Sequence, residues 1–329
     1  MFSNHLIHKN FSKLILKGLV IRSTGLWYDV LSEANERYNC RIVGKFKLSG
    51  LKLTNPVAVG DLVDFEIENH EEKIGIIKKI HNRINYVVRQ SPRKKHFLHL
   101  LASNIDQAVL IVTINFPNLK QGFIDRFLLM TEPYNIPVII VFNKSDLYND
   151  DDSALFEYFK KIYEKIGYTC LLTSNINEKQ IEVLKSVLKN KTSLIAGQSG
   201  VGKSTLINIL QPKLNLRTGE ISDFTGKGQH TTTFAEMFKL DFGANIIDTP
   251  GIKGLSFNNL SVLDVAHNFR EFFNYSSECR YSDCTHRNEP KCAVKNAIES
   301  GEISELRYNN YLQILEEIEA QNHWDIHEM

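Results

Sequence analysis

Residues 197–205 read Gly-Gln-Ser-Gly-Val-Gly-Lys-Ser-Thr, and this stretch decides the fold of the centre of the chain. It follows a short apolar run, Ser193–Ala196, and precedes an apolar helical pattern, Leu206–Leu210. A strand, a glycine-rich loop and a helix with the spacing G-x-x-x-x-G-K-[ST] form a phosphate-binding P-loop. Glycines let the loop curl so that backbone N–H groups point at phosphate oxygens, and the helix dipole adds its positive end. The stretch therefore predicts a nucleotide-phosphate site in preference to an ordinary strand-to-helix turn.

The residues of this loop have distinct predicted roles. We expect Lys203 to reach the β- and γ-phosphates and to stabilise the charge on the transferring phosphoryl group, and Ser204 to bind Mg²⁺. The other loop residues that we expect to contact the nucleotide are Gly197, Gln198, Ser199, Gly200, Val201, Gly202 and Thr205.

Upstream of the loop, from residue 106, apolar strand-like runs alternate with helical stretches. Strands of near-continuous Val, Ile and Leu that alternate with helices indicate a parallel sheet covered on both faces. We therefore expect a central α/β domain. The runs are Gln107–Thr113, Gly122–Tyr134, Val138–Phe142, Ser153–Ile166, Cys170–Thr173 and Glu178–Lys189.

A second motif lies at the end of one apolar run, where the chain reads Asn143-Lys-Ser-Asp146. An [NT]-K-x-D tetrad after a buried strand reads the base in GTPases, so this part of the chain resembles the GTPase superfamily. Asp146 would accept hydrogen bonds from guanine N1–H and the 2-amino group, and against adenine the buried carboxylate would stay unpaired. Asn143 would hold the base and its loop, and the stem of Lys144 would cover the ring. Alone the tetrad could also cap a helix, but beside a P-loop it favours guanine.

Two serines complete the expected base site. Ser145 lies inside the tetrad, and Ser174 lies in Thr173-Ser-Asn175 at the end of the next strand-like run. In GTPases a short loop at this place touches the guanine oxygen through a backbone N–H. We therefore count Ser145 and Ser174 among the nucleotide-binding residues.

Two further motifs follow the P-loop. Residues 226–233 read Gly-Lys-Gly-Gln-His-Thr-Thr-Thr, and a later apolar run leads into Asp248-Thr-Pro-Gly251. In a D-x-x-G motif the carboxylate holds Mg²⁺ through water and the glycine N–H senses the γ-phosphate. Thr232 or Thr233 is expected to close over the metal in the triphosphate state, and the sequence does not choose between them. We expect Ser204 and Thr233 to be the magnesium ligands.

The order of these motifs departs from that of ordinary GTPases. Those run from the P-loop through the threonine switch and D-x-x-G to N-K-x-D, whereas here N-K-x-D comes first. The set is complete but circularly permuted, so the segment after the second switch is tied directly to a nucleotide-sensitive loop. GTPases that orient water with a side chain just after D-x-x-G use glutamine, which Ile252 cannot replace. His230 is the nearest candidate for orienting the attacking water, and a loop histidine without a catalytic part is the alternative.

The first part of the chain is basic and rich in predicted strands. Residues 1–97 hold 17 Lys and Arg against 9 Asp and Glu, whereas the remainder holds 22 against 29. A basic segment on an acidic body indicates an anionic partner, nucleic acid first of all, and a solvated basic face is the alternative. Five short strands have the size of a small closed barrel, either an OB-fold or an SH3-like barrel. The expected strands are Gly18–Val30, Cys40–Leu48, Asp61–Ile67, Ile74–Ile80 and Asn85–Arg89.

Three of the five cysteines lie close together near the end of the chain. With one histidine they give the spacing C-x4-C-x-H-x5-C. A Cys3His set is a closed tetrahedral zinc site, which predicts a structural metal, and disulfides are not expected without other clustered thiols. The expected zinc ligands are Cys279, Cys284, His286 and Cys292. The other two cysteines, Cys40 and Cys170, are expected to be buried apolar residues.

Length and composition indicate a multidomain globular protein. A chain of 329 residues predicts two or three domains, and 43% hydrophobic with 23% charged residues are typical of an ample core. The stretch Met1–Lys17 is broken by charged and histidine residues and has no apolar segment of signal-peptide or membrane-spanning kind. We therefore expect a cytoplasmic protein that has no membrane partner.

A leading barrel, a permuted GTPase core and a C-x4-C-x-H-x5-C module, in this order, resemble the RsgA (YjeQ) family of small ribosomal subunit biogenesis GTPases. The resemblance covers nearly the whole chain, and the combination is more specific than any single motif. We expect an OB-fold RNA-binding domain over 1–92, a circularly permuted α/β P-loop GTPase domain over 98–258 and a zinc-binding helical domain over 259–329.

The resemblance also implies a function. It implies hydrolysis of GTP to GDP and phosphate, stimulated by the small (30S) ribosomal subunit during its late maturation and followed by release. It further implies contact with rRNA, one structural Zn²⁺ and cytoplasmic action. We also expect Mg²⁺ with GTP and a monomeric protein. The match around His230 supports that residue as the water-orienting group. Two alternatives remain: an RNA-binding scaffold with a structural nucleotide site, and a permuted GTPase that acts on the large subunit.

Overall fold

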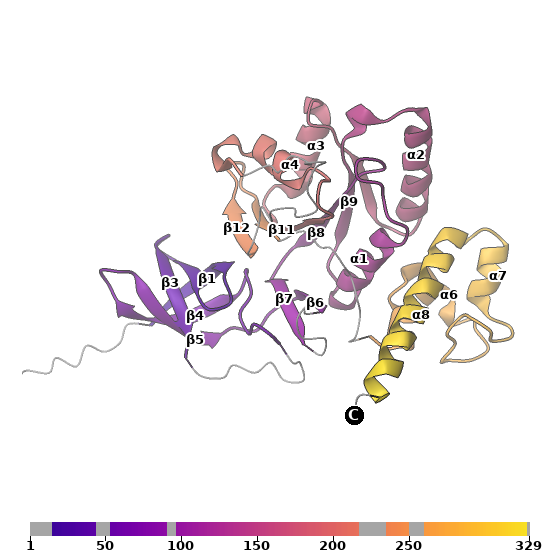
Figure 1. Cartoon of the computed structure of the whole chain (residues 1–329), viewed down its shortest axis with the longest axis horizontal. Coiled ribbons are helices and arrows are strands. Elements are labelled where there is room, and N and C mark those ends of the chain that lie inside the picture. The colour runs from indigo at the N-terminus through magenta and orange to yellow at the C-terminus, as the bar shows by residue number, and fades with distance from the viewer. Residues whose placement is uncertain (1–14, 44–52, 91–96, 217–234, 250–259, 328–329) are drawn as a thin grey trace, which may run out of the picture.

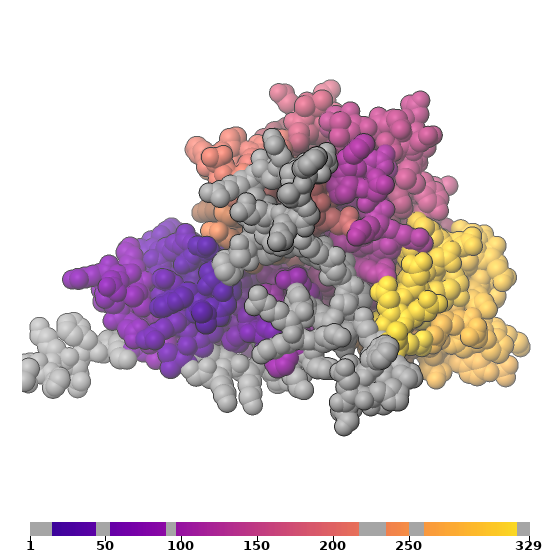
Figure 2. Space-filling view, viewed as in Figure 1, coloured from indigo at the N-terminus to yellow at the C-terminus, as the bar shows by residue number. Residues whose placement is uncertain are grey.

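The structure is a computed structural model that describes residues 15–43, 53–90, 97–216, 235–249 and 260–327. Three bodies follow one another along the chain: a β-barrel, a central α/β domain and a group of helices at the C-terminal end. Figure 2 shows the barrel and the C-terminal helices on opposite flanks of the central domain. In the described residues, both the barrel and the C-terminal helices contact the central domain.

Five strands close the barrel into a ring. They are β1 (Ile15–Ser23), β2 (Tyr28–Ser32), β3 (Arg37–Ile42), β4 (Leu62–Asn69) and β5 (Ile74–Ile80). The order around the ring is β1-β2-β3-β5-β4, and β4 pairs back onto β1. All neighbours are antiparallel except β3 and β5, which are parallel. This strand order is that of an OB-fold. It decides between the two barrels that the sequence left open, an OB-fold and an SH3-like barrel.

Two of the strand predictions in this region are wrong in detail. The run Gly18–Val30 is not one strand but the hairpin β1–β2, because the backbone turns at Thr24–Trp27, where Thr24 N–H donates to the Trp27 carbonyl and Gly25 has φ 88°. The run Asn85–Arg89 is a strand, β6 (Tyr86–Gln90), but it lies outside the barrel. It pairs with β7 (Leu98–Ser103) in a separate two-stranded sheet. The barrel still has five strands because the first predicted strand supplies two of them.

The β6–β7 hairpin connects the barrel to the central domain. On the barrel side, Asp61 accepts hydrogen bonds from Arg83 and from the Ser103 hydroxyl, each at 2.6 Å. On the other side, Val87 belongs to the core of the central domain, and the ring centroids of Tyr86 and Tyr134 lie 4.5 Å apart. The hairpin is thus packed on both neighbours.

A six-stranded sheet forms the central domain. Its strands are β8 (Gln107–Val112), β9 (Val138–Phe142), β10 (Thr169–Leu172), β11 (Thr192–Gly197), β12 (Ala235–Lys239) and β13 (Asn245–Asp248). Their order is β10-β9-β8-β11-β13-β12, and only β12 is antiparallel to its neighbour. The outer edge of β12 pairs with barrel strand β1 over two residues, so the two sheets run into one another.

Helices cover both faces of the central sheet, as the apolar strands predict. On one face α1 (Phe123–Thr131) and α2 (Asp150–Lys165) pack on alternate strand residues such as Leu110 and Ile140. On the other face α3 (Glu178–Leu188) and α4 (Lys203–Leu210) pack on residues of the opposite phase, such as Val109 and Ile139. Short 3-10 turns lie at Glu132–Tyr134, Ser145–Leu147 and Pro212–Leu214.

Local sequence signals fix the starts of these helices. Asn149 caps α2 in a capping box with Asp152, whose backbone N–H donates to the Asn149 side chain at 2.8 Å. Asn177 caps α3 by accepting from the Gln180 backbone at 3.2 Å. Such caps begin a helix directly after a strand-end loop, which leaves the loop residues free to line a site.

The C-terminal body consists of α5 (Val262–His267), α6 (Arg270–Ser276), α7 (Ala293–Glu299) and α8 (Glu305–His327). Apolar residues of this body, among them Phe269, Phe272 and Tyr311, join the core that contains residues of α1 and α2. Across the parts of the chain that the structure describes, none of the helices has the length and apolarity that a membrane crossing needs.

Candidate functional site

The carboxyl ends of four parallel strands bring the predicted motifs to one edge of the central sheet. Asn143 follows β9, Thr173 follows β10, Gly197 ends β11 and Asp248 ends β13. Because β9, β8, β11 and β13 run in parallel and β10 continues the sheet beyond β9, these ends lie along the same edge. Open α/β sheets bind ligands in the crevice at that edge. The motifs that are far apart in sequence therefore converge on one candidate nucleotide site.

The P-loop runs from the end of β11 to the start of α4, as its sequence predicts. Gly200 and Gly202 have φ values of 86° and 94°, in the left-handed region that favours glycine. A Cβ on Gly202 would lie 2.5 Å from the Asn143 side-chain nitrogen, so nothing larger than glycine fits against the base-reading loop. Val201 is buried between these glycines, whereas Ser199 and Gly200 are exposed. The conformation of the loop therefore suits a site in which backbone N–H groups, and not side chains, face the phosphate oxygens.

Lys203 lies inside the curl of this loop. Its Nζ donates to the carbonyl oxygens of Gly197 and Gln198 at 2.9 and 2.7 Å. Burial lowers the pKa of Lys203, and the charge of Asp248 opposes that shift by raising it. Ser204 and Thr205 occupy the first turn of α4 directly after it, both half-buried. The ammonium group and the helix N-terminus therefore provide positive charge on the same side of the loop.

Asn143 locks the base-reading loop to the phosphate loop. Its side chain is fully buried, its Nδ2 donates to the Val201 carbonyl at 2.8 Å, and its Oδ1 accepts from the Thr173 hydroxyl at 3.0 Å. Thr173 is thus a positioning residue that sequence reasoning missed as such. The available signal was its place directly before Ser174, at the end of the neighbouring strand.

Lys144 spans the two loops from the outer side. Its φ is 63°, and its Nζ donates to the carbonyls of Gly200 and Phe116, each at 2.7 Å. Burial lowers its pKa, while Asp146 acts in the opposite direction. The contact to Phe116, in the loop after β8, was not predictable from the tetrad. Through it a third loop joins the site.

Asp146 and Ser174 face one another at the base end of the site. The Ser174 hydroxyl donates to Asp146 Oδ1 at 2.6 Å, and the Ser145 hydroxyl lies 3.3 Å from Gln180 Oε1. These residues line a cavity of about 320 Å³. Its lining is completed by Tyr148, Ser153, Leu172, Ile176, Asn177 and Gln180. The structure thus brings Asp146, the predicted base-reading carboxylate, and the serine of the next loop together.

Asp248 lies at the end of β13, nearly fully buried, and its charge acts on Lys203 across the site. Ser204 follows Lys203, on which the charge of Asp248 acts, and the hydroxyl and carboxylate oxygens of Ser204 and Asp248 are donors of the kind that Mg²⁺ binds. Ser204 and Asp248 therefore fit the expected metal. The other switch predictions, His230, Thr232, Thr233 and Gly251, lie outside the described residues.

The Cys3His set forms a second candidate site, between α6 and α7. The ligand atoms of Cys279, Cys284, His286 and Cys292 all lie within 4.8 Å of one another. The sulfur atoms of Cys279 and Cys292 are 4.0 Å apart, and His286 Nδ1 lies 3.7 and 3.4 Å from them. Tetrahedral Zn–S and Zn–N bonds of about 2.3 and 2.1 Å separate neighbouring ligand atoms by roughly these distances. The geometry fits a metal ion, with His286 bound through Nδ1.

Residues outside the motif hold this metal loop in shape. Glu289 accepts from the Thr285 backbone and hydroxyl and from the Arg287 backbone, at 2.6 to 2.8 Å. Although burial alone would raise the pKa of Glu289, these hydrogen bonds lower it to about 2. Tyr308 and Tyr311 of α8 donate to the carbonyls of His286 and Thr285 at 2.8 and 2.6 Å. The spacing of cysteines gave no signal for these supports.

The remaining cysteines are not part of either site. Cys40 and Cys170 are buried in strands β3 and β10, as predicted. Burial raises the pKa of each thiol to about 12, so both stay protonated and act as apolar residues.

Comparison with known proteins supplies the context of these sites. The model of the family described as RsgA GTPase matches residues 80–258, and that of the RsgA N-terminal domain matches residues 17–77. A protein of Flavobacterium psychrophilum named small ribosomal subunit biogenesis GTPase RsgA is 49% identical over 305 residues, which are 92% of this chain and 93% of that protein. A protein of the same name from Phocaeicola vulgatus is 48% identical over 92% of this chain and 97% of its own length.

Two solved structures resemble the whole chain. The crystal structure of YjeQ from Thermotoga maritima is 36% identical with a TM-score of 0.73, and covers 93% of this chain and 99% of that chain. The structure of YloQ, described as a circularly permuted GTPase, is 29% identical with a TM-score of 0.69, and covers 97% of this chain and 99% of that chain. The likeness therefore includes all three bodies and the permuted order of the motifs.

Proposed function

The chain belongs to the RsgA family of circularly permuted GTPases, and on that premise we propose that it hydrolyses GTP to GDP and phosphate during late maturation of the small (30S) ribosomal subunit. It would bind that subunit and its rRNA and leave it after hydrolysis. The two relatives described above are named small ribosomal subunit biogenesis GTPases. The observation that carries the proposal for this chain is the Asn143 bridge, because it holds the base-reading loop and the phosphate loop in one site despite their reversed order.

Each side chain of the nucleotide site has a proposed task. Lys203 exchanges its two loop carbonyls for phosphate oxygens, and the loop amides support the same charge. Asp146 selects guanine, and the Ser174 hydroxyl, 2.6 Å away, keeps that carboxylate aimed. Lys144 covers the base, and Asn143 fixes the distance between base and phosphates. The proposed nucleotide-binding set is Asn143, Lys144, Ser145, Asp146, Ser174, Gly197–Thr205, Thr232, Thr233, Asp248 and Gly251.

Two steps rest on residues outside the described part of the chain. We propose that His230 orients the attacking water, since Ile252 replaces the glutamine that other GTPases use. We propose Ser204 and Thr233 as magnesium ligands, with Thr232 as the alternative to Thr233. Mg²⁺ supplies neutralisation of charge between the β- and γ-phosphates when it is bound with GTP. Asp248 would hold the Mg²⁺ ion through a water molecule of the ion's hydration shell.

We propose one structural Zn²⁺ at Cys279, Cys284, His286 and Cys292. Three observations support this proposal. The four donor atoms lie close together, the three thiolates are soft ligands that suit zinc, and four protein ligands complete a tetrahedral site that has no position for a substrate. The unpaired His286 Nε2, buried against the ring of Phe272, is consistent with binding through Nδ1.

We also propose the domain limits 1–92, 98–258 and 259–329, a monomeric state and a cytoplasmic location without a membrane partner. The matched family ranges support the limit at 258, where the GTPase match ends, whereas that match begins at residue 80, within the proposed first domain. The location follows from the proposed ribosomal partner. Light scattering of the purified chain tests the monomer.

One experiment separates the proposal from its alternatives: GTP hydrolysis measured with small subunits, with large subunits and with neither. Stimulation by small subunits alone supports the proposal. Stimulation by large subunits would favour the second GTPase class, and equal slow turnover in all three would favour an RNA-binding scaffold. Asp146→Asn tests the base site, since it should exchange GTP preference for xanthosine nucleotide. His230→Ala should keep nucleotide binding and lose turnover.

A further inference from the structure

Lys144 connects the nucleotide site to a loop that lies outside all of its motifs. This loop, residues 113–118 between β8 and α1, we call the β8 loop. The Lys144 ammonium group donates to the Gly200 carbonyl of the P-loop and to the Phe116 carbonyl of the β8 loop, each at 2.7 Å. The P-loop and the β8 loop are therefore both neighbours of that ammonium group.

The β8 loop is fixed by hydrogen bonds of its own. The buried Thr113 hydroxyl donates to the Pro117 carbonyl at 2.7 Å and so closes the loop on itself. The Asn115 side-chain nitrogen donates to Asp152 Oδ1 at 2.6 Å and so ties the loop to the first turn of α2. With Lys144 as the third tether, the loop is held on three sides, and the side chain at its tip has a defined place.

That side chain is the phenyl ring of Phe116, which is 62% exposed. Among the described residues Phe116 belongs to none of the buried apolar clusters, so the core does not use the ring. Its φ is 59°, a backbone conformation that bulky residues rarely adopt. Residues held in such conformations gather at ligand sites, where the surrounding structure enforces them.

The position of Phe116 corresponds to one part of a bound nucleotide. Asp146 lies at the proposed base end of the site, and the P-loop lies at the phosphate end. The ribose joins these two parts, so it lies near the Lys144 ammonium group, which donates to the P-loop. Because the Phe116 side chain branches from the Cα beside the carbonyl that accepts from Lys144, its ring lies at the ribose part of the site.

From this geometry we propose that the Phe116 ring packs against the ribose of the bound guanine nucleotide. Phe116 is then a binding residue that no nucleotide motif contains. Contact with the C–H groups of the sugar removes apolar ring surface from water, which favours binding. The inference rests on the proposed function, because it requires a guanine nucleotide between Asp146 and the P-loop.

A contact to the ribose has a distinct kinetic signature. GMP, GDP and GTP share the same sugar, so the contact strengthens the binding of all three by one factor. It does not change between the ground state and the transition state of phosphoryl transfer. Interactions of this kind lower KM and leave kcat unchanged.

The test uses the full chain and measures the affinities of GMP, GDP and a non-hydrolysable GTP analogue by competition against a ribose-labelled fluorescent GDP. The variants are Phe116→Ala and Phe116→Trp. Tyr158→Ala is the matched control, since Tyr158 is a 49% exposed aromatic residue of the same domain, in α2. Steady-state hydrolysis of GTP gives KM and kcat for each protein.

Phe116→Ala should weaken the binding of all three nucleotides by the same factor, about 5-fold, as expected for loss of one aromatic contact. KM should rise by that factor and kcat should stay unchanged. Tyr158→Ala should change neither quantity. Phe116→Trp should keep the affinity of the wild type, because a larger aromatic ring can make the same contact.

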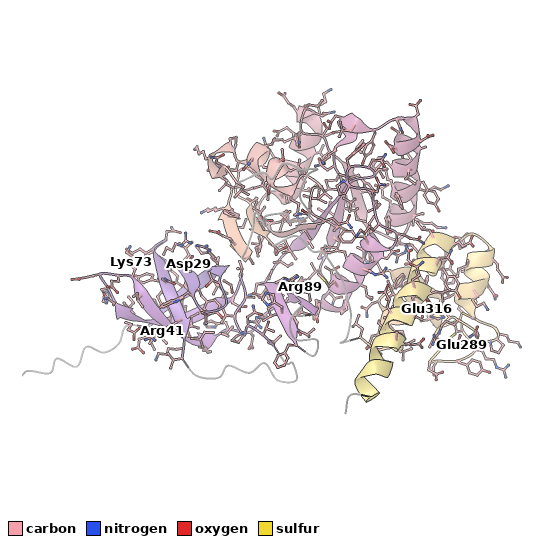
Figure 3. The ribbon with its side chains drawn as sticks, viewed as in Figure 1. Asp29, Arg41, Lys73, Arg89, Glu289 and Glu316 are labelled. Carbon is pink, nitrogen blue, oxygen red and sulfur yellow. The ribbon has the colours of Figure 1, made fainter. Side chains whose placement is uncertain are left out.

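Phe116→Trp also gives a direct measure of proximity. Energy transfer from the introduced indole to the ribose label should exceed the transfer from the chain's own tryptophans, which the wild type measures. Those two residues, Trp27 and Trp324, belong to the other two bodies. In Figure 3, Asp29, close to Trp27 in the sequence, and Glu316, in the same helix as Trp324, lie on opposite flanks of the central domain.

Three results would overturn the proposal: an unchanged affinity in Phe116→Ala, no added energy transfer in Phe116→Trp, or a larger loss for GDP than for GMP. The last result would mean that the variant disturbs the P-loop through Lys144. Thermal unfolding confirms that each variant is folded, which the exposure of Phe116 favours.

The subunit-stimulated hydrolysis described above is measured in parallel. If Phe116→Ala binds nucleotide normally and loses only the stimulation by small subunits, the ring contacts the partner, and this inference is refuted while the proposed function stands. A wild-type chain that binds no guanine nucleotide would refute the proposed function and this inference together.

Discussion

Both end domains meet the GTPase domain through arginines and carboxylates, but the C-terminal cluster is buried and the barrel cluster is not. Arg307 of α8 lies 2.5 Å from Asp125 of α1 and 2.5 Å from Glu271 of α6. The exposed fractions of these side chains are 2, 0 and 7%. Asn310 and the Tyr163 hydroxyl also donate to Asp125, at 2.6 and 2.9 Å. Every carboxylate of this cluster is therefore closely held.

At the barrel, arginines of β1 and β3 lie 3.8 and 3.9 Å from Glu236 of β12, and all three side chains are partly exposed. The closer contacts between the barrel and the central domain lie at and just before the β6–β7 hairpin, in the buried pair Arg83–Asp61 and the apolar packing of Val87. Glu236 is thus held less closely at this junction than Asp61 is by Arg83.

Burial, and not the number of charge pairs, determines how firmly each end domain is held against the GTPase domain. Separating a buried cluster leaves uncompensated charges in a medium of low polarity, whereas an exposed pair is replaced by water or by another ion at little cost. We infer that the C-terminal helices move with the GTPase domain as one body and that the barrel side responds to ligands. The sequence ties the C-terminal segment directly to the second switch, and its response to the nucleotide stays a prediction.

The largest effect that would sharpen this comparison is expected from metal removal. If Zn²⁺ is bound by the Cys3His set, a chelator should unfold the loop between α6 and α7, since metal binding in such small sites contributes on the order of 10 kcal/mol. Limited proteolysis should then cut within residues 279–292, while amide exchange in the five barrel strands stays unchanged. Added Zn²⁺ should restore protection. An intact loop after complete chelation would contradict the structural role.

A second large effect is expected from Arg307→Met. It leaves Asp125 and Glu271 buried without their cation, which should lower the free energy of unfolding by about 3–5 kcal/mol. Denaturant unfolding measures this change. Lys165→Gln is the control at the same junction, because the Lys165–Glu302 pair at 3.0 Å is exposed on both sides and should contribute within about 0.5 kcal/mol. Equal effects of the two variants would remove burial as the deciding factor.

The nucleotide site was largely predictable because its chemistry depends on short-range sequence. Each of its three motifs is short and predicts its own local backbone geometry: the P-loop, the tetrad at a strand end and the Asp at another strand end. The parallel sheet then brings these strand ends together. The structure places Asn143, Asp146, Ser174 and Lys203 where the patterns suggested. The clustering of the three cysteines and His286 was predictable for the same reason, since residues 279–292 form a local motif.

What sequence reasoning missed depends on partners far away along the chain. Arg307 pairs with Asp125 across 182 residues, and no local pattern distinguishes it from a solvated helix arginine. Strand β6 was placed in the barrel because its pattern is that of a strand, and only pairing with β7, after the basic stretch 91–96, shows otherwise. The Arg22–Glu236 register was equally invisible, because edge pairing between domains leaves no periodic signal.

A third prediction tests whether burial or the domain in which it lies determines how much an arginine contributes to the free energy of unfolding. Arg83 belongs to the barrel side, yet it is buried and donates twice to Asp61 at 2.6 Å. Arg83→Met should lower the free energy of unfolding by about 2–3 kcal/mol, somewhat less than at Arg307, since Asp61 keeps its other donors. Arg41→Gln, in an exposed barrel pair, is the control and should have a far smaller effect. A small effect at Arg83 would mean that barrel contacts are weak regardless of burial.

The smallest predicted effect on stability is the most specific one. Glu236→Gln should change the free energy of unfolding by no more than about 0.5 kcal/mol, because its ion pairs are long and partly exposed. Locally, however, it removes the charge that holds β1 against β12, so amide exchange at Ala235 and Glu236 should become faster. Raising the salt from about 0.1 M to 1 M, which shortens the screening length from about 10 to 3 Å, should speed the same amides in the wild type. The amides around Arg307 should not respond, since a buried cluster is screened far less than an exposed one. Salt-independent exchange at β12, or a salt response at both junctions, would mean that the two clusters do not differ as their burial indicates.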